Sequence, residues 1–179
     1  MENHGGAEAH HPVAGRLNRS PVAGEYELGQ LCSGLQSVEE IRELLHQRHL
    51  DESFVTGTKV LVDDTRDFYM YVDDKNRRLV ACLSHIKDSD PRIVYLDYLH
   101  ELVHLFQLHD GRNLYDRRFK YVRRTTEIEA YTVAVMEGKR MGMADTELAE
   151  YLRVEWISDD EHMELVKAVG LKPPATASG

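Results

Sequence analysis

Three residues in one apolar stretch have the types and the spacing for metal chemistry. Residues 95–111 read YLDYLHELVHLFQLHDG and include His100, Glu101 and His104. Residues four apart lie on one face of a helix, so the two imidazoles can converge on a single ion. Glu101 leans to the side of that ion, where a carboxylate can take a proton from activated water. The spacing predicts that His100 and His104 bind Zn2+ and that Glu101 is a catalytic general base.

The rest of this helix supports the same hypothesis. Its apolar residues cover a broad arc and form core, whereas Asp97, His100, His104 and Gln107 form a polar line on the opposite face. Polar groups on a largely buried helix need partners. Zinc is one such partner, and hydrogen bonds within a metal-free core are the alternative.

Composition limits the classes of protein to consider. The chain has 179 residues, enough for one domain with a core, and a net charge of −9, which disfavours binding to nucleic acid or to an anionic membrane. No segment approaches the roughly 20 apolar residues of a membrane span. Cys32 and Cys82 have no metal-binding spacing, which is typical of free thiols in a reducing compartment. We expect a cytoplasmic protein with no nucleic-acid or membrane partner, and the sequence does not indicate its oligomeric state.

The elements that position these residues follow from local patterns. We expect residues 1–24 to be a disordered lead-in, residues 25–171 to form one domain, and residues 172–179 to be a flexible tail. A capping box of Ser37 and Glu40 predicts a helix over 38–49. Three β-rich runs, at 58–62, 68–72 and 78–86, have short connections and predict an antiparallel meander.

From residue 90 onward the pattern is helical. Asp90 and Pro91 open the helix of the histidines, and Gly111 closes it. Further helices are expected from Thr125 or Thr126 to Gly138 or Gly142, over 145–156, and from a capping box at Ser158 to Gly170. The fold class is therefore α+β, with a small antiparallel sheet first and a helical half second.

The motif HELVH resembles the active-site helix of the zincin metallopeptidases. The order of elements, with TTEIEAYTVAVMEG following the motif, is similar to the gluzincin branch and to its single-domain minigluzincins. The E-x-E-A segment also resembles the phage-repressor-cleaving metallopeptidases of bacteria. The resemblance implies a zincin-like fold, a peptide or protein substrate, and hydrolysis of peptide bonds by zinc-activated water. A catalytically silent scaffold that binds or regulates other proteins is the alternative function.

The gluzincin resemblance implies a third metal ligand, a glutamate on the second helix. Glu127 is favoured because its face carries a stripe of small residues, and its E-x-x-A pattern resembles gluzincin glutamate helices. Glu129 is an alternative, although its position three after Thr126 suits a capping box. Asp110 is another, because it stands at the third-ligand position of the metzincin pattern HExxHxxGxxH, in which Gln107 replaces the glycine.

Two features of the resemblance lack an assigned residue. Gluzincins often have an aspartate four residues after the ligand glutamate, which orients the first histidine, and Tyr131 stands there instead. The donor that stabilises the transition state is not defined by the sequence; the candidates are Tyr115, Tyr121, Arg124 and Tyr131. By the same resemblance, the run at 78–86 is the candidate edge strand for the substrate backbone.

Overall fold

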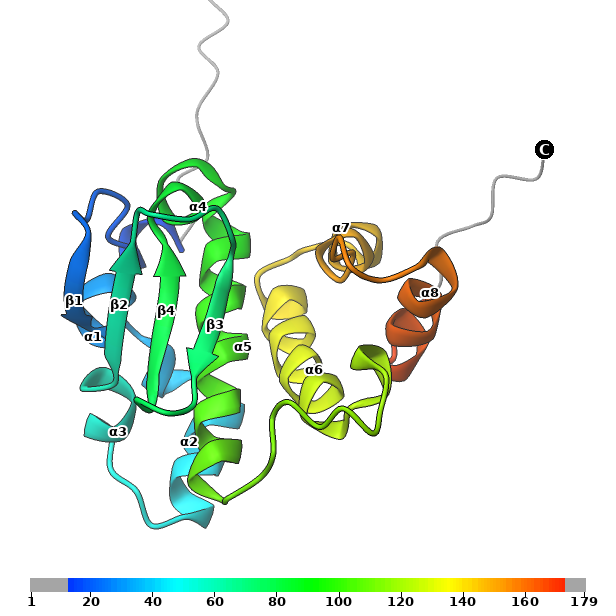
Figure 1. Cartoon of the computed structure of the whole chain (residues 1–179), viewed down its shortest axis with the longest axis horizontal. Helices are drawn as coiled ribbons and strands as arrows, with labels where there is room; N and C mark the ends of the chain where they lie inside the picture. Colours follow the sequence, from blue (N-terminus) through cyan, green and yellow to red (C-terminus); the bar gives the residue numbers. More distant parts are fainter. Residues whose placement is uncertain (1–12, 173–179) are drawn as a thin grey trace, which may run out of the picture.

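The structure is a computed structural model, and it describes residues 13–172. Within these residues the chain forms eight α-helices and one four-stranded sheet, an α+β architecture (Figure 1). The strands are β1 (Gly24–Glu27), β2 (Lys59–Asp63), β3 (Met70–Asp73) and β4 (Arg78–Cys82). The helices are α1 (Leu28–Leu31), α2 (Glu39–Gln47), α3 (Ser53–Thr56), α4 (Leu83–Asp88), α5 (Pro91–His109), α6 (Thr125–Arg140), α7 (Asp145–Tyr151) and α8 (Asp159–Ala168), with 3-10 turns η1 (Ala14–Arg16), η2 (Leu35–Ser37) and η3 (Tyr121–Arg123).

The sheet is mixed, so the predicted antiparallel meander is wrong. Its order is β1-β2-β4-β3. The central strands β2 and β4 are parallel, whereas the outer strands β1 and β3 pair antiparallel with β2 and β4 respectively. Val60 lies opposite Leu79 across the parallel pair. Residues 64–69 connect β2 to β3, which does not pair with β2. The turn at 74–77 then brings β4 back between β2 and β3. Period-2 alternation defines strands but not the order in which they pair.

The strand nearest the histidines also differs from the prediction. The run expected as a strand over 78–86 ends at Cys82, and the chain continues directly as α4. Because β4 has a partner on both sides, it is an internal strand and not the edge strand that we expected. The edge on this side of the sheet is β3.

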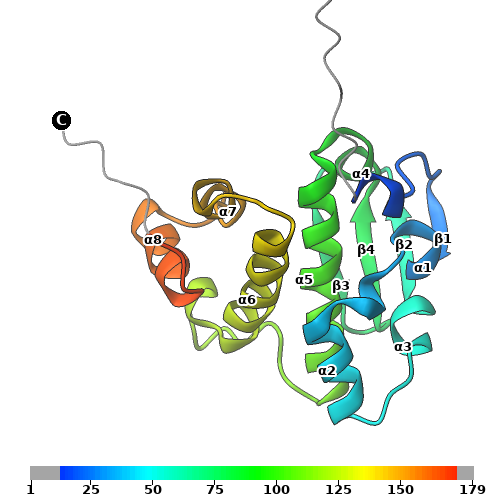
Figure 2. The same cartoon turned by 180° about the vertical axis from the view of Figure 1, so that it is seen from behind.

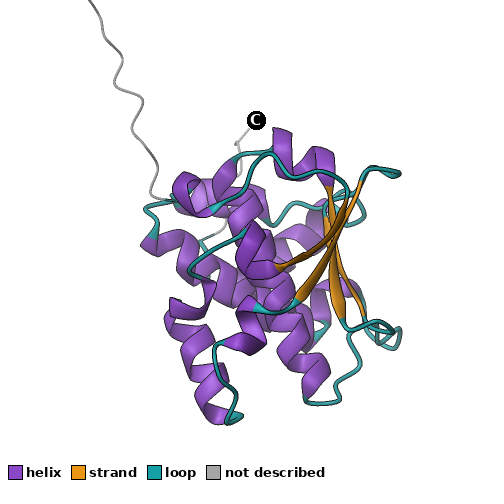
Figure 3. Cartoon of the chain, turned by 90° about the vertical axis from the view of Figure 1, so that its left-hand side faces the viewer, coloured by secondary structure: helices purple, strands orange, loops and turns teal. Residues whose placement is uncertain are grey.

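The long helix α5 lies at the centre of the molecule. It covers one face of the sheet, and α6 packs on its other side (Figure 2). Figure 3 shows helices gathered on one face of the sheet. Because α5 is covered from two sides, every side chain from Val94 to Gln107 is buried except that of Asp97. The predicted start is confirmed: the Asp90 side chain accepts a hydrogen bond from the Arg92 backbone N–H at 2.8 Å.

The predicted helix ends have mixed outcomes. The capping box at Ser158 and Glu161 is present at the start of α8. The one predicted at Ser37 is wrong, since α2 begins after Val38, whose side chain makes no cap. The helix expected over 145–156 ends earlier, at Tyr151.

The start of the chain was expected to be disordered through residue 24. Residues 1–12 lie outside the described part, as do residues 173–179 of the expected tail. From Val13 onward the chain packs on the domain: Val13 is buried, Leu17 forms a β-bridge with Cys32, and the Arg16 guanidinium donates to the Tyr95 hydroxyl at 3.2 Å. No helix in the described part is long and apolar enough to cross a membrane.

Candidate metal centre

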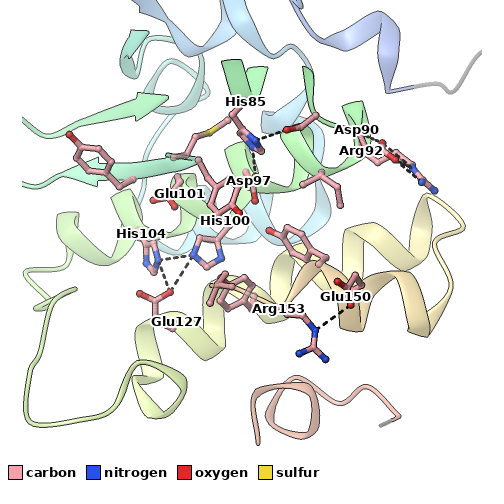
Figure 4. A pocket seen from close by; sticks show the side chains of 18 of the residues that line it. His85, Asp90, Arg92, Asp97, His100, Glu101, His104, Glu127, Glu150 and Arg153 are labelled. Atoms are coloured by element: carbon pink, nitrogen blue, oxygen red, sulfur yellow. Dashed lines mark hydrogen bonds and ion pairs between the residues drawn. The ribbon is translucent and has the colours of Figure 1, made fainter. Parts of the chain in front are cut away.

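The structure brings His100, His104 and Glu127 together in the interior. The two histidines come from adjacent turns of α5, and Glu127 comes from the first turn of α6 (Figure 4). The Nε2 atoms of the histidines lie 3.0 Å apart, and Oε2 of Glu127 lies 3.4 Å from that of His100 and 3.3 Å from that of His104. All three residues are buried, and together they could hold a metal ion.

Two of the three distances fit a small tetrahedral ion. Zinc binds nitrogen and oxygen at about 2.0–2.2 Å, so tetrahedral ligands lie about 3.3–3.5 Å from one another. Two of the observed separations fall in this range and the third is slightly shorter. Oε2 of Glu127 is also buried without a hydrogen-bond partner among the described residues. Three acceptor atoms that face one another in this way require a cation, either a proton or a metal ion.

The hydrogen bonds of Gln107 fix the orientation of His104. The Gln107 amide nitrogen donates to the Thr126 carbonyl at 3.0 Å and to Glu129 Oε2 at 3.1 Å. Because a carbonyl can only accept, the Gln107 oxygen must be the atom that faces His104, where it lies 2.7 Å from Nδ1. Nδ1 therefore carries a hydrogen, and in the neutral imidazole Nε2 presents its lone pair to Glu127.

His100 is held in a different way. Its ring lies against the ring of Tyr131, with centroids 4.2 Å apart, and its Nδ1 has no hydrogen-bond partner among residues 13–172. Tyr131 stands where gluzincins often have an aspartate. The sequence left the partner of His100 unassigned, and in the structure this partner is the Tyr131 ring, which restricts the His100 imidazole by packing.

Protonation of the metal-free site follows from the same geometry. Burial disfavours the charged form of His104, but the close contact and the charge of Glu127, whose Oε2 lies 3.3 Å from Nε2, outweigh it and raise the His104 pKa to about 9. Burial likewise opposes ionisation of Glu127, yet the two imidazoles hold its pKa well below the usual range. Without a metal, the raised pKa of His104 favours a protonated imidazole beside the Glu127 carboxylate at neutral pH.

Glu101 lies beside this cluster and faces the adjoining cavity. Its side chain is nearly buried and accepts no hydrogen bond from the described residues. Burial raises the pKa of Glu101, and the neighbouring imidazoles oppose that rise. A buried carboxylate with free acceptor atoms beside a cation site is a suitable proton acceptor.

The two alternative third ligands have other partners. Asp110 follows α5 and pairs with Arg48, whose Nη2 lies 2.5 Å from Oδ2. Glu129 pairs with Arg112 and accepts the second hydrogen bond of Gln107. It makes no cap, since α6 begins after Arg124 without a side-chain cap. Among the three candidates, only Glu127 belongs to the cluster that could hold a metal.

Small residues on α6 allow its close approach to neighbouring helices. Ala130 and Ala134 are fully buried. A Cβ on Gly138 would lie 2.4 Å from Leu148 on α7 and 3.3 Å from Leu96 on α5. The small-residue stripe therefore serves the packing of α7 as well as that of the histidine helix.

The four candidate donors for the transition state are already hydrogen-bonded. The Tyr121 and Tyr131 hydroxyls lie 2.8 Å apart, the Tyr115 hydroxyl donates to the Val72 carbonyl at 2.5 Å, and Arg124 donates to the Asp116 carbonyl at 3.2 Å. The two hydroxyls of the Tyr121 and Tyr131 pair share one hydrogen between them, so one hydroxyl hydrogen remains to be donated elsewhere. The three tyrosines line the cavity.

A cavity of about 860 Å³ opens onto the cluster. It lies between β3, α5 and the segment around α7, and its walls include Glu101, both histidines and Glu127. Sequence reasoning missed His85, Asp97 as its partner, and Tyr151, which line the same cavity. His85 was hidden in a run that was read as strand, and only the polar line on α5 gave a signal for Asp97.

Comparison with protein-family models, with curated proteins and with solved structures finds no match for this chain. Function is therefore argued from the site itself.

Proposed function

We propose that this protein is a zinc-dependent peptidase of the zincin type. The observation that carries the proposal is the convergence of His100, His104 and Glu127 into a buried group that could hold a metal ion, with Glu101 beside them at the wall of a cavity. Glu101 accepts no hydrogen bond from the described residues and faces the cavity, where its carboxylate is open to a water molecule and a substrate. Proton transfer during hydrolysis is a role that suits this carboxylate.

The chain supplies proton transfer and positioning. A bound zinc ion would act as a Lewis acid and lower the pKa of a water molecule to about 7. Glu101 accepts a proton from the attacking water as its oxygen bonds to the peptide carbonyl carbon. The same carboxylate then gives the proton to the leaving nitrogen as the C–N bond breaks. Gln107 and Tyr131 keep the two imidazoles in one orientation throughout.

The edge strand β3 supports binding of an extended peptide. Met70 and Tyr71 of β3 line the cavity, and β3 has a strand partner on one side only within the described sheet. An extended chain that adds to such an edge gains main-chain hydrogen bonds with little demand on sequence. Tyr115 already binds the Val72 carbonyl, which limits the free part of this edge to the end nearer Met70.

Metal-dependent cleavage tests the proposal directly. Purified protein is incubated with a peptide library after treatment with chelator, and again after addition of one equivalent of zinc. We expect cleavage only in the zinc-loaded sample, and products identified by mass spectrometry. Absence of cleavage in both samples, with zinc bound, would favour the silent scaffold instead.

A further inference from the structure

A second polar group faces the cavity one turn before the HExxH motif. Asp97 accepts a hydrogen bond from His85, with Oδ2 and Nε2 2.7 Å apart, and the other ring nitrogen of His85 lies 2.8 Å from the Ser89 hydroxyl (Figure 4). When Ser89 donates to Nδ1, His85 is an uncharged imidazole whose Nε2–H binds Asp97. The pair then keeps the full negative charge of the carboxylate. His85 is buried, so Asp97 is held in one position.

No arginine or lysine in the described part of the chain pairs with Asp97. Two arginines line the same cavity, but each is bound by two carboxylates: Arg92 by Asp90 and Glu147, and Arg153 by Glu150 and Asp159. Figure 4 shows the pairs of Asp90 with Arg92 and of Glu150 with Arg153 away from Asp97. No arginine or lysine of the described residues thus competes with a ligand for Asp97.

Three tyrosines line the same cavity as this carboxylate and lie near enough to be affected by its charge. Burial raises the pKa of Tyr69, Tyr131 and Tyr151, and the nearby charge of Asp97 raises each further. The Tyr69 ring lies 5.3 Å from the ring of His85, and the rings of Tyr131 and Tyr151 lie 5.9 Å apart. The Tyr151 hydroxyl is buried, and it lies near enough to Asp97 to interact with that carboxylate. Aromatic faces with a carboxylate favour organic cations.

We propose that Asp97, with Tyr69, Tyr131 and Tyr151 near it, is a substrate subsite that binds an ammonium or guanidinium group. This inference rests on the proposed peptidase function. Asp97 lies four residues before Glu101, about 6 Å along the helix. A cation bound there belongs to a peptide residue within one or two positions of the bond that is cleaved. It is either a lysine or arginine side chain or the free amino terminus of the substrate.

Binding to the Glu101→Gln protein tests the subsite without hydrolysis. Two pairs of peptides are compared by calorimetry. In the first, both ends are blocked and one central residue is either lysine or its neutral counterpart norleucine. In the second, a peptide with neutral side chains has either a free or an acetylated amino terminus. We expect the charged member of at least one pair to bind about tenfold more tightly, and added salt to reduce the difference.

Two variants separate the role of Asp97 from general electrostatics. Asp97→Asn keeps the shape and the hydrogen bond to His85 but removes the charge, and it should abolish the preference. Asp160→Asn is the matched control, because Asp160 is an exposed residue of α8 that does not line the cavity, and it should leave the preference unchanged.

The outcomes distinguish the subsite from the peptidase proposal. Equal affinity for charged and neutral peptides in both pairs would overturn the subsite, even if the wild type cleaves peptides. A preference that survives Asp97→Asn would also overturn it. If the preference depends on Asp97 but the zinc-loaded wild type cleaves nothing, the subsite stands and the peptidase proposal fails.

Discussion

Gln107 joins the ligand histidine His104 to the neighbouring helix. Its oxygen lies 2.7 Å from Nδ1 of His104, and its nitrogen donates to the backbone of α6 at Thr126, one residue before Glu127. The Gln107 amide thus fixes the orientation of the His104 imidazole and links it to the start of α6, which carries Glu127. Such partners of metal ligands typically affect metal affinity by 10- to 100-fold.

Replacing Gln107 should weaken metal binding without removing a ligand. We expect Gln107→Leu to lower zinc affinity by about 10- to 100-fold, because His104 loses the group that fixes its tautomer. Competition with a chromogenic chelator measures the change. Gln47→Leu on α2 is the control, since Gln47 is exposed, bonds Glu43, and belongs neither to the cluster nor to the lining of the cavity. Unchanged affinity in Gln107→Leu would show that the amide does not orient the ligand.

Loss of the third ligand should affect zinc binding far more than loss of either nearby carboxylate. Zinc at about 100 times its dissociation constant should stabilise the wild type by about 2.7 kcal/mol, a rise in Tm on the order of 5–10 °C. We expect Glu127→Ala to lose most of this rise, because one of three ligands is gone. Glu129→Ala and Asp110→Ala should retain it. A collapse in either control, with Glu127→Ala unaffected, would reassign the ligand.

Stability of the metal-free protein should fall as the pH rises above neutrality. The His104 pKa is raised to about 9 in the folded state and is about 6.5 in the unfolded chain. The stabilisation from its pairing with Glu127 is therefore complete below pH about 6.5 and is lost as the pH rises through about 9. Urea unfolding of chelator-treated protein should show a loss of roughly 1–3 kcal/mol over this range. Glu127→Gln should lack that component.

Zinc affinity should have the opposite pH dependence. Zinc must displace the proton of His104, so apparent affinity should increase about tenfold per pH unit below the pKa of His104 and level off near it. Titrations in two buffers of different ionisation enthalpy measure the released proton. An affinity that is constant between pH 7 and pH 8 would contradict a protonated His104 in the metal-free site.

Local signals in the sequence predicted the helices of the site well. Asp90 and Pro91 define the start of α5, and a capping box defines that of α8, because caps depend on residues close in sequence. The spacing of His100 and His104 was sufficient to place both on one helix face. The favoured Glu127 was chosen from small residues on its face, a pattern that reflects how closely two helices approach.

Long-range pairing could not be predicted in the same way. Ser37 and Glu40 have the spacing of a capping box, yet Glu40 binds Arg140, a hundred residues away. Glu129 has similar spacing but pairs with Arg112. The order of the strands likewise depends on where β4 inserts, and the alternation of its residues contains no information about that.

The Glu101→Gln variant is the most direct test of a metallopeptidase centre in this protein. The amide keeps the size of the side chain but cannot accept the proton of the attacking water. We expect wild-type zinc content by elemental analysis, an unchanged Tm, and peptide cleavage reduced by about 100-fold or more. Glu43→Gln, which changes an exposed carboxylate of α2 that does not line the cavity, should cleave as the wild type does. Cleavage at the wild-type rate by zinc-loaded Glu101→Gln protein would contradict the account.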